Sequence, residues 1–306
     1  MDTHLVVGAG PVGTATTRRL LEAGHRVRVV TRSGSGPDGS ERVAADAGDA
    51  TRLAELAEGT VAIYNCVNPT YSRWEQDWPP VAAALLAAAE SSGAVLATVG
   101  NLYGYGRVDA PMTEQTPLAA TGHKGKVRNA MWGDALAAHR AGRIRTFEVR
   151  GSDYLGGNSL LSVLVTPALR KGRRAFVPAD LDAPHTWTCV EDVAALLVTG
   201  AQDERAWGRA WHVPSDQPRT LRELAAIAAS QLGVEARLSP MPYAVLWAAG
   251  LVDPMAKELR ETQHQFRRPF VLDSTAAQET FGLRPTPTPE AVGIDLAAGA
   301  PTGVRA

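Results

Sequence analysis

The sequence predicts an α/β fold in which a doubly wound parallel sheet carries helices on both faces and a smaller C-terminal α/β domain follows. Short apolar runs alternate with helical patterns through the first half of the 306 residues, which is typical of a parallel sheet wrapped by helices. A glycine-rich turn joins the first apolar run to the first helical pattern. After about Gly151, glycine, proline and aromatic residues separate shorter elements. We therefore expect one domain over residues 1–150 and a second mainly over residues 151–306, with some of its segments returning to the first sheet.

In the first half, each predicted strand is a short apolar or β-branched run, and the helical patterns are bounded by glycine or proline. Gly24 ends the first helix, Pro79 and Pro80 open a helix rich in alanine and leucine, and Gly93 closes it. In chain order we expect strand 5–7, helix 12–23, strand 27–31, strand 42–45, helix 52–58, strand 61–65, helix 79–91, strand 94–99, helix 127–141 and strand 146–149.

The second half has fewer regular patterns. Two short β-branched or aromatic runs predict strands, three apolar patterns predict helices, and the last fifteen residues are rich in alanine, glycine and proline. We expect strands 175–177 and 211–213, helices 192–199, 221–232 and 243–251, and a frayed end over residues 292–306.

Composition and charge exclude several classes of protein. Hydrophobic residues make up 45% and charged residues 21% of the chain, which excludes a disordered protein. The formal net charge of -1 provides no basic field for nucleic acid. The two cysteines give no disulfide framework, and the seven histidines have no spacing typical of a metal site.

The location of the protein follows from what its N-terminal and apolar segments can do. A strand follows the N-terminus too closely for a signal peptide. The apolar stretches are too short to cross a bilayer, which takes about 18 residues. We expect a cytoplasmic protein that acts on a small molecule and has no nucleic-acid partner, no membrane partner and no bound metal.

Gly8, Gly10 and Gly13 form a Gly-x-Gly-x-x-Gly motif between the first predicted strand and helix. In this context the first glycine permits a tight turn, the second lets a pyrophosphate approach the backbone, and the third permits close helix packing. The helix expected from Val12 offers free N–H groups and a positive dipole end, which attract phosphate. Pro11 and Val12 are predicted cofactor contacts at this turn. The motif therefore predicts a dinucleotide-binding site.

The end of the second predicted strand bears on which dinucleotide binds. NAD sites usually carry an acidic residue there, which accepts from the ribose hydroxyls, but this chain has Thr31, Arg32 and Ser33. Arg32 can hold a 2′-phosphate by charge-assisted hydrogen bonds, each worth about 1.5–3 kcal/mol. We therefore predict NADP as the cofactor, with a solvated surface role for Arg32 as the alternative.

Two further segments reach the carboxyl edge of the predicted sheet, where ligands bind in open α/β folds. Asp46 follows the third strand and is either an acceptor for the adenine amino group or an ordinary loop aspartate. Cys66, Val67 and Asn68 follow the fourth strand and are predicted cofactor contacts. We interpret Cys66 as a buried packing residue rather than a nucleophile, because no base lies near it in the sequence.

In their order and spacing these motifs resemble those of the short-chain dehydrogenase/reductase superfamily, and most closely its extended branch, the NAD(P)-dependent epimerase/dehydratase family. The resemblance rests on residues 8–13, 45–49, 98–104, 111–114, 149–156 and 185–193, and on the region around Pro285. It implies a Rossmann-type domain, a smaller substrate domain, and a reaction in the cleft between them. It also implies a Ser/Thr, Tyr and Lys trio, in which the tyrosine moves a proton at a carbonyl or alcohol oxygen and the lysine lowers the tyrosine pKa. Dimers are common in that family.

The expected Tyr-x-x-x-Lys motif is missing between residues 105 and 150. A count without a gap puts Lys124 at the tyrosine position and Arg128 at the lysine position. A two-residue insertion puts Gly122 and Lys126 there instead. Neither alignment restores a tyrosine. Either another residue supplies the proton, or the reaction needs no oxygen protonation by a tyrosine, as in some double-bond reductions, or the protein binds NADP without turnover.

The catalytic candidates are Tyr103, Lys124 and Thr98, and the further candidate proton donors are His123 and Tyr154. Tyr103 belongs to the segment that resembles the family motif, and Thr98 lies one residue before the expected serine position. Each has a structural alternative: packing for the tyrosines, and a solvated helix start for the basic residues.

Three functions remain open. The main prediction is an NADP(H)-dependent oxidoreductase that reduces a carbonyl or an activated double bond of a small organic substrate, with a non-standard proton donor. The first alternative is a nucleotide-sugar epimerase or dehydratase with a recycled cofactor. The second is a catalytically inactive NADP-binding regulatory protein. Trp74 and Trp78 either line an apolar substrate pocket or belong to the core.

Overall fold

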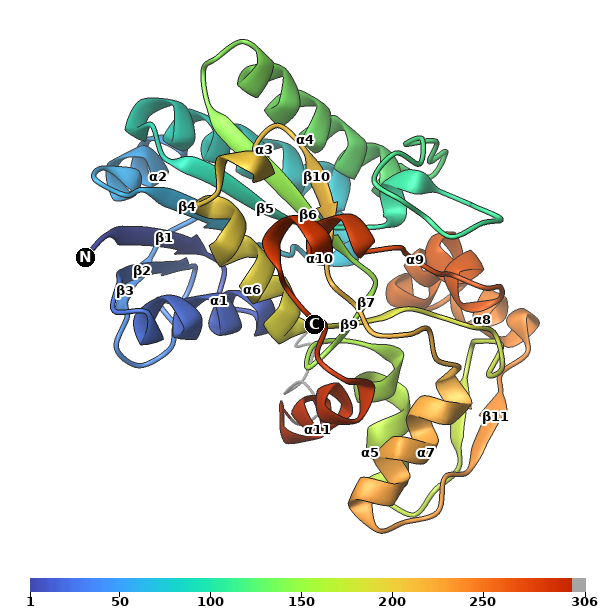
Figure 1. The fold of residues 1–306 in the computed structure, drawn as a ribbon. Helices are drawn as coiled ribbons and strands as arrows, with labels where there is room; N and C mark the ends of the chain where they lie inside the picture. The colour runs from blue at the N-terminus through green and yellow to red at the C-terminus, as the bar shows by residue number, and fades with distance from the viewer. Residues whose placement is uncertain (299–306) are drawn as a thin grey trace.

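A seven-stranded parallel sheet organises the computed structural model, which describes residues 1–298 (Figure 1). The strand order is β10-β6-β5-β4-β1-β2-β3, so the chain builds outward from β1 in both directions. The predicted doubly wound parallel fold is therefore confirmed. The strands are β1 (Thr3–Val7), β2 (Arg26–Thr31), β3 (Glu41–Ala44), β4 (Ala62–Asn65), β5 (Val95–Asn101), β6 (Arg145–Gly151) and β10 (Ala210–His212).

Helices cover both faces of this sheet (Figure 1). On one face, α1 (Pro11–Glu22) packs against α6 (Val190–Ala201), and α10 (Thr275–Phe281) adds to the same apolar cluster. On the other face lie α2 (Ala50–Ala57), α3 (Trp74–Ser92) and α4 (His123–Arg140), which share a second cluster. Burial of both faces explains why the strands are short apolar runs without polar alternation.

The helix expected to open at Pro79 begins at Trp74 instead, so that prediction was wrong by five residues. Pro79 and Pro80 lie inside α3 and remove two backbone donors. The carbonyl groups that lose these hydrogen bonds lie four residues earlier. They belong to exposed residues, so water can donate to them instead. Trp74 and Trp78 are 1% and 0% exposed and anchor the first turns, so both belong to the core.

The helix expected from Val127 begins at His123. Gly122 takes the N-cap position, and Lys124 and Gly125 are buried immediately after it. A Cβ added to Gly125 would lie 2.6 Å from the carbonyl oxygen of Tyr103, so this turn packs directly on the segment after β5. A pattern of apolar residues does not mark this helix start, because a lysine and a glycine occupy the buried positions.

The C-terminal part has its own apolar core, which is built on two small parallel sheets. One pairs β7 (Asp153–Leu155) with β9 (Trp187–Cys189), and the other pairs β8 (Ala175–Val177) with β11 (Leu238–Pro240). The helices of this part are α5 (Thr166–Arg170), α7 (Leu221–Leu232), α8 (Tyr243–Ala249), α9 (Pro254–Thr262) and α11 (Thr288–Ala298). The shorter 3₁₀ and π segments along the whole chain are η1 (Tyr71–Arg73), η2 (Tyr103–Tyr105), η3 (Leu161–Val165), η4 (Glu204–Ala206) and η5 (Gln263–Phe266).

The prediction of a frayed end over residues 292–306 is wrong for residues 292–298, because these residues form the last part of α11. Asp295 is 1% exposed and accepts hydrogen bonds from the Gly156 amide and the Ser162 hydroxyl, which ties the helix to the C-terminal core. Residues 299–306 lie outside the described part of the chain. Over residues 1–298, no helix combines the length and the apolar character that a membrane span requires.

Candidate functional site

The glycine motif forms an open cradle between β1 and α1. Gly8 has a φ of 99°, and a Cβ on it would lie 2.6 Å from the Cys66 carbonyl oxygen. A Cβ on Gly13 would lie 1.9 Å from the Gly8 carbonyl oxygen. A Cβ on Gly10 would meet nothing within 4 Å. The first and third glycines therefore allow close packing, and the second leaves free space in front of the helix, as a pyrophosphate needs.

The residues predicted to select the cofactor lie at the carboxyl ends of β2 and β3. Arg32 follows β2 directly and is exposed. Asp46 is also exposed, and its Oδ1 accepts a hydrogen bond from the Gly48 amide at 2.8 Å. Pro11 and Val12 occupy the first turn of α1, next to the cradle. Both predicted binding groups are thus exposed at the same edge of the sheet as the glycine cradle.

Cys66, Val67 and Asn68 follow β4, the strand next to β1. Cys66 is buried, and burial raises the pKa of its thiol to about 12, so it stays protonated and unreactive at neutral pH. The backbone carbonyl of the same residue packs against the first glycine of the motif. Asn68 is exposed at the edge of the sheet.

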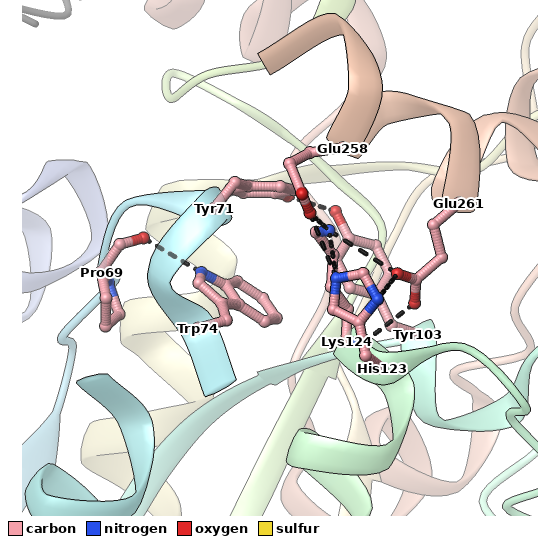
Figure 2. Close-up of polar contacts among 8 residues, drawn as sticks. All are labelled: Pro69, Tyr71, Trp74, Tyr103, His123, Lys124, Glu258 and Glu261. Carbon is pink, nitrogen blue, oxygen red and sulfur yellow. Dashed lines mark hydrogen bonds and ion pairs between the residues drawn. The ribbon is translucent and has the colours of Figure 1, made fainter. Parts of the chain in front are cut away.

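Two tyrosines meet beyond the carboxyl ends of β4 and β5. Tyr71 belongs to η1 and Tyr103 to η2, and their hydroxyl groups form a hydrogen bond (Figure 2). The Trp74 ring lies 5.0 Å from the Tyr71 ring and 5.9 Å from the Tyr103 ring, between centroids, and its Nε1 donates to the Pro69 carbonyl at 3.0 Å. Burial raises the pKa of both phenols, so neither ionises at neutral pH.

Lys124 is fully buried at the start of α4, where it meets two glutamates from α9 (Figure 2). Its Nζ forms an ion pair with Glu258 and lies 3.6 Å from Glu261 Oε2, while its backbone N–H donates to Glu261 Oε1 at 2.9 Å. His123 Nδ1 lies 2.8 Å from Glu261 Oε2. Because the Lys124 Nζ also lies 5.5 Å from the centroid of the Tyr71 ring, this cluster borders the tyrosine pair.

Arg128 lies one helical turn after Lys124 and is also buried. Its guanidinium lies 4.8 Å from the Trp74 ring and 4.3 Å from the Trp78 ring, and its Nη1 donates to the Val99 carbonyl at 3.2 Å. Its Nε is buried without a hydrogen-bond partner. Arg128 therefore fixes α3, α4 and β5 together below the tyrosine pair.

The fold brings only some of the predicted catalytic residues together. The fold brings Tyr103 and Lys124 to the same place, with Tyr71 beside both. Thr98 lies on β5, between Asn65 of β4 and Glu148 of β6 in the sheet register. Among residues 1–298, no hydrogen bond joins Thr98 to Tyr103 or Lys124.

Tyr154 and His185 are both engaged in contacts within the fold. Tyr154 donates a hydrogen bond to the Gly100 carbonyl at 2.7 Å. The His185 ring stacks on Phe266 and Phe270, and burial lowers its pKa to about 4. Both side chains are held in place by these contacts and are poorly suited to donate a proton to a substrate.

Sequence reasoning missed Asp153, the first residue of β7, which follows the end of β6. Burial, together with the charge of Asp295, raises the pKa of its carboxyl to about 7. The Asp153 charge raises the pKa of Tyr71 and of Tyr103, so the carboxyl acts electrostatically on both phenols. A carboxyl two residues after the end of a strand of the parallel sheet is a signal that the sequence contained.

Comparison with solved structures finds the same fold in enzymes of sugar nucleotides. A UDP-glucose 4-epimerase shares 18% identity over 97% of this chain and 96% of its own, with a TM-score of 0.78. The dTDP-glucose 4,6-dehydratase of Bacillus anthracis, solved with NAD, shares 14% identity over 97% and 96%, with a TM-score of 0.76. The UDP-glucose 4-epimerase of Thermotoga maritima, solved with UDP-glucose, shares 15% identity over 97% of each chain, with a TM-score of 0.77.

A search of curated proteins finds no match. The NAD dependent epimerase/dehydratase family matches residues 4–213. The matched range runs from β1 to the end of the sheet at β10, and it contains the glycine cradle, the tyrosine pair and Lys124. The family expected from the sequence is therefore confirmed, and the chain belongs to the NAD dependent epimerase/dehydratase family.

Proposed function

We propose that the chain is a nicotinamide-dependent epimerase or dehydratase that acts on a nucleotide sugar and recycles its cofactor. The observation that carries this proposal is the family match over residues 4–213. The matched range includes the open cradle at Gly10, where a dinucleotide would bind. Enzymes of UDP-glucose and dTDP-glucose are among the structures with the same fold. This reading was the first alternative from the sequence, and the family match favours it over a simple reductase.

The residues at the carboxyl edge of the sheet fit a dinucleotide. Gly10 and the N-terminus of α1 would hold the pyrophosphate, Arg32 the 2′-phosphate of NADP, and Asp46 the adenine amino group. Cys66, Val67 and Asn68 would border the cofactor at the end of β4. When bound, the nicotinamide would supply the oxidising and reducing chemistry at one substrate carbon.

The chain itself must move a proton at the substrate oxygen. We assign this task to the pair of Tyr103 and Tyr71 with Asp153, instead of the missing tyrosine and lysine. The phenols have raised pKa values and are poor bases alone, but a phenol can pass on one proton while it accepts another. Asp153, with a pKa of about 7, can take or return that proton at neutral pH. We leave Lys124 out of this proton transfer, because its ammonium is paired with Glu258.

The first expected result concerns the reaction. Incubated with NADP⁺ or NAD⁺ and UDP-glucose, UDP-galactose or dTDP-glucose, the enzyme should convert a sugar with no net change in NADPH or NADH absorbance. Product formation followed by chromatography measures the turnover. Net oxidation of the cofactor with carbonyl substrates, and no conversion of sugars, would favour the reductase. The same proton-carrying groups could protonate the substrate in that reaction. Tight cofactor binding without turnover on either panel would contradict both enzyme assignments.

The second expected result concerns the cofactor. Arg32→Ala should weaken NADPH binding by about tenfold to hundredfold, since one or more charge-assisted hydrogen bonds of about 1.5–3 kcal/mol are lost. NADH binding should not change, because NADH has no 2′-phosphate. Isothermal titration of both nucleotides measures the two affinities.

The matched control is Arg52→Ala, which removes an exposed arginine that pairs with Glu55 on α2. It should leave both nucleotide affinities unchanged. Wild-type protein that binds NADH as tightly as NADPH would contradict the proposed preference for NADP.

A further inference from the structure

We propose that Asp2, His4 and His25 form a binding site for one divalent transition metal ion, with Zn²⁺ as the fitting class. One ligand atom from each residue lies within 4.8 Å of the others. His25 Nδ1 and Asp2 Oδ2 are 4.0 Å apart. Ligand atoms at about 2.0–2.2 Å from a zinc ion lie about 3–4 Å from one another, so a small closing movement would complete the site. The exposed Asp2 side chain can make that movement.

Two imidazole nitrogens in this group are buried and have no hydrogen-bond partner. They are His4 Nε2 and His25 Nδ1. His4 is 1% exposed, so water does not reach it freely. A buried polar atom without a partner is costly and calls for a ligand or an ion. Both unpartnered nitrogens belong to residues of the same three-residue group. One metal ion would give each of them a partner.

The surroundings orient and prepare His4 as a ligand. The Tyr64 hydroxyl lies 3.3 Å from His4 Nδ1, which leaves Nε2 for the ion. Metal-binding histidines usually have such a partner on their other nitrogen, because it fixes the ring and the tautomer.

The backbone holds the three residues together before any ion binds. β1 and β2 pair with Thr3 opposite Arg26 and His4 opposite Val27. The Arg26 amide also donates to the Asp2 carbonyl at 2.9 Å. These bonds place residues 2–4 beside residues 25–27, which the sequence spacing alone does not reveal. The proposal therefore departs from the expectation that the chain binds no metal.

The donor set indicates the kind of metal and its role. Two imidazoles and one carboxylate suit Zn²⁺, Co²⁺ or Ni²⁺, whereas Ca²⁺ and Mg²⁺ prefer oxygen ligands alone. The site lies at the amino ends of β1 and β2, and the glycine cradle lies at the carboxyl end of β1. The ion would therefore stabilise the start of the sheet and take no part in the proposed reaction.

The experiment uses the full chain without an affinity tag, first depleted of metal with a chelator. Titration with ZnCl₂ should show one saturable equivalent and raise the thermal unfolding midpoint, because the ion binds only the folded chain. Co²⁺ should give a visible absorption band of nitrogen and oxygen coordination at the same stoichiometry. His25→Ala and Asp2→Asn should each weaken Zn²⁺ binding at least tenfold.

Tyr64→Phe keeps the ring in the core and removes only the hydroxyl near His4, so it should weaken binding by about tenfold. His139→Ala, which removes a histidine from the far end of α4, is the control and should bind as the wild type does. The proposal is overturned if the wild type takes up no saturable equivalent. Unchanged affinity in His25→Ala, or an equal loss in His139→Ala, would overturn it too.

Discussion

Asp153→Asn should lower turnover by a factor of about 10² or more, the amount that a positioned acid or base typically contributes. Asparagine keeps the size and the polar contacts of Asp153 but cannot exchange a proton. In the direction that removes a proton from a substrate hydroxyl, the wild-type rate should rise with pH through about 7, where Asp153 ionises. The variant should lose this limb of the pH–rate profile.

A matched change tests whether this loss is specific. Asp192, at the start of α6, is another carboxyl with a raised pKa, which burial brings to about 6. It accepts hydrogen bonds from the amide and the hydroxyl of Thr286. Asp192→Asn should lower stability but keep the pH limb near 7. A pH profile that is the same in Asp153→Asn and the wild type would remove Asp153 from the mechanism.

The same substitution has a consequence for stability that needs no substrate. The pKa of Asp153 is about 7 in the folded chain and about 3.9 in an unfolded one. Between these values the folded state binds one more proton than the unfolded state, so stability falls as pH rises from about 4 to about 7. Asparagine removes this fall. Urea unfolding at pH 5 and pH 8 should therefore show a smaller loss of stability on raising the pH in Asp153→Asn.

The nucleotide half of the fold was predictable because its determinants are local. Each central strand is a short apolar run, and the motif of Gly8, Gly10 and Gly13 marks the first turn between strand and helix. Errors arose where distant residues decide the burial of a helix start. α3 begins at Trp74, which packs on two tyrosines, and α4 begins at His123, which meets α9.

The candidate site was predictable only in part for the same reason. Tyr103 was found because it lies in a recognisable motif after β5. Its partner Tyr71 lies 32 residues earlier, and the two glutamates that meet Lys124 lie more than 130 residues later. No local spacing reveals these contacts, since the meeting of η1 with η2 and of α9 with the start of α4 creates them.

Lys124→Ala should reduce turnover at least tenfold, because Lys124 holds α9 against the tyrosine pair. Its buried ammonium joins the carboxylates of Glu258 and Glu261 to the start of α4. Removal of one member of a buried ion pair typically costs about 3–5 kcal/mol. The glutamate side chains are 15% and 21% exposed, so water can offset part of that cost. Hydrogen exchange should be faster in α9 of the variant, and steady-state kinetics measure the turnover.

The control lies two residues away on the same helix. Lys126 is exposed, so Lys126→Ala removes an equal charge from α4 without touching α9 and should leave both turnover and exchange unchanged. If Lys124→Ala speeds exchange in α9 and lowers turnover together, the lysine acts by positioning α9 beside the tyrosine pair. If turnover falls while exchange in α9 stays at the wild-type rate, Lys124 contributes to the chemistry itself. Unchanged kinetics would remove Lys124 from the mechanism and leave the tyrosine pair and Asp153 to account for the proton.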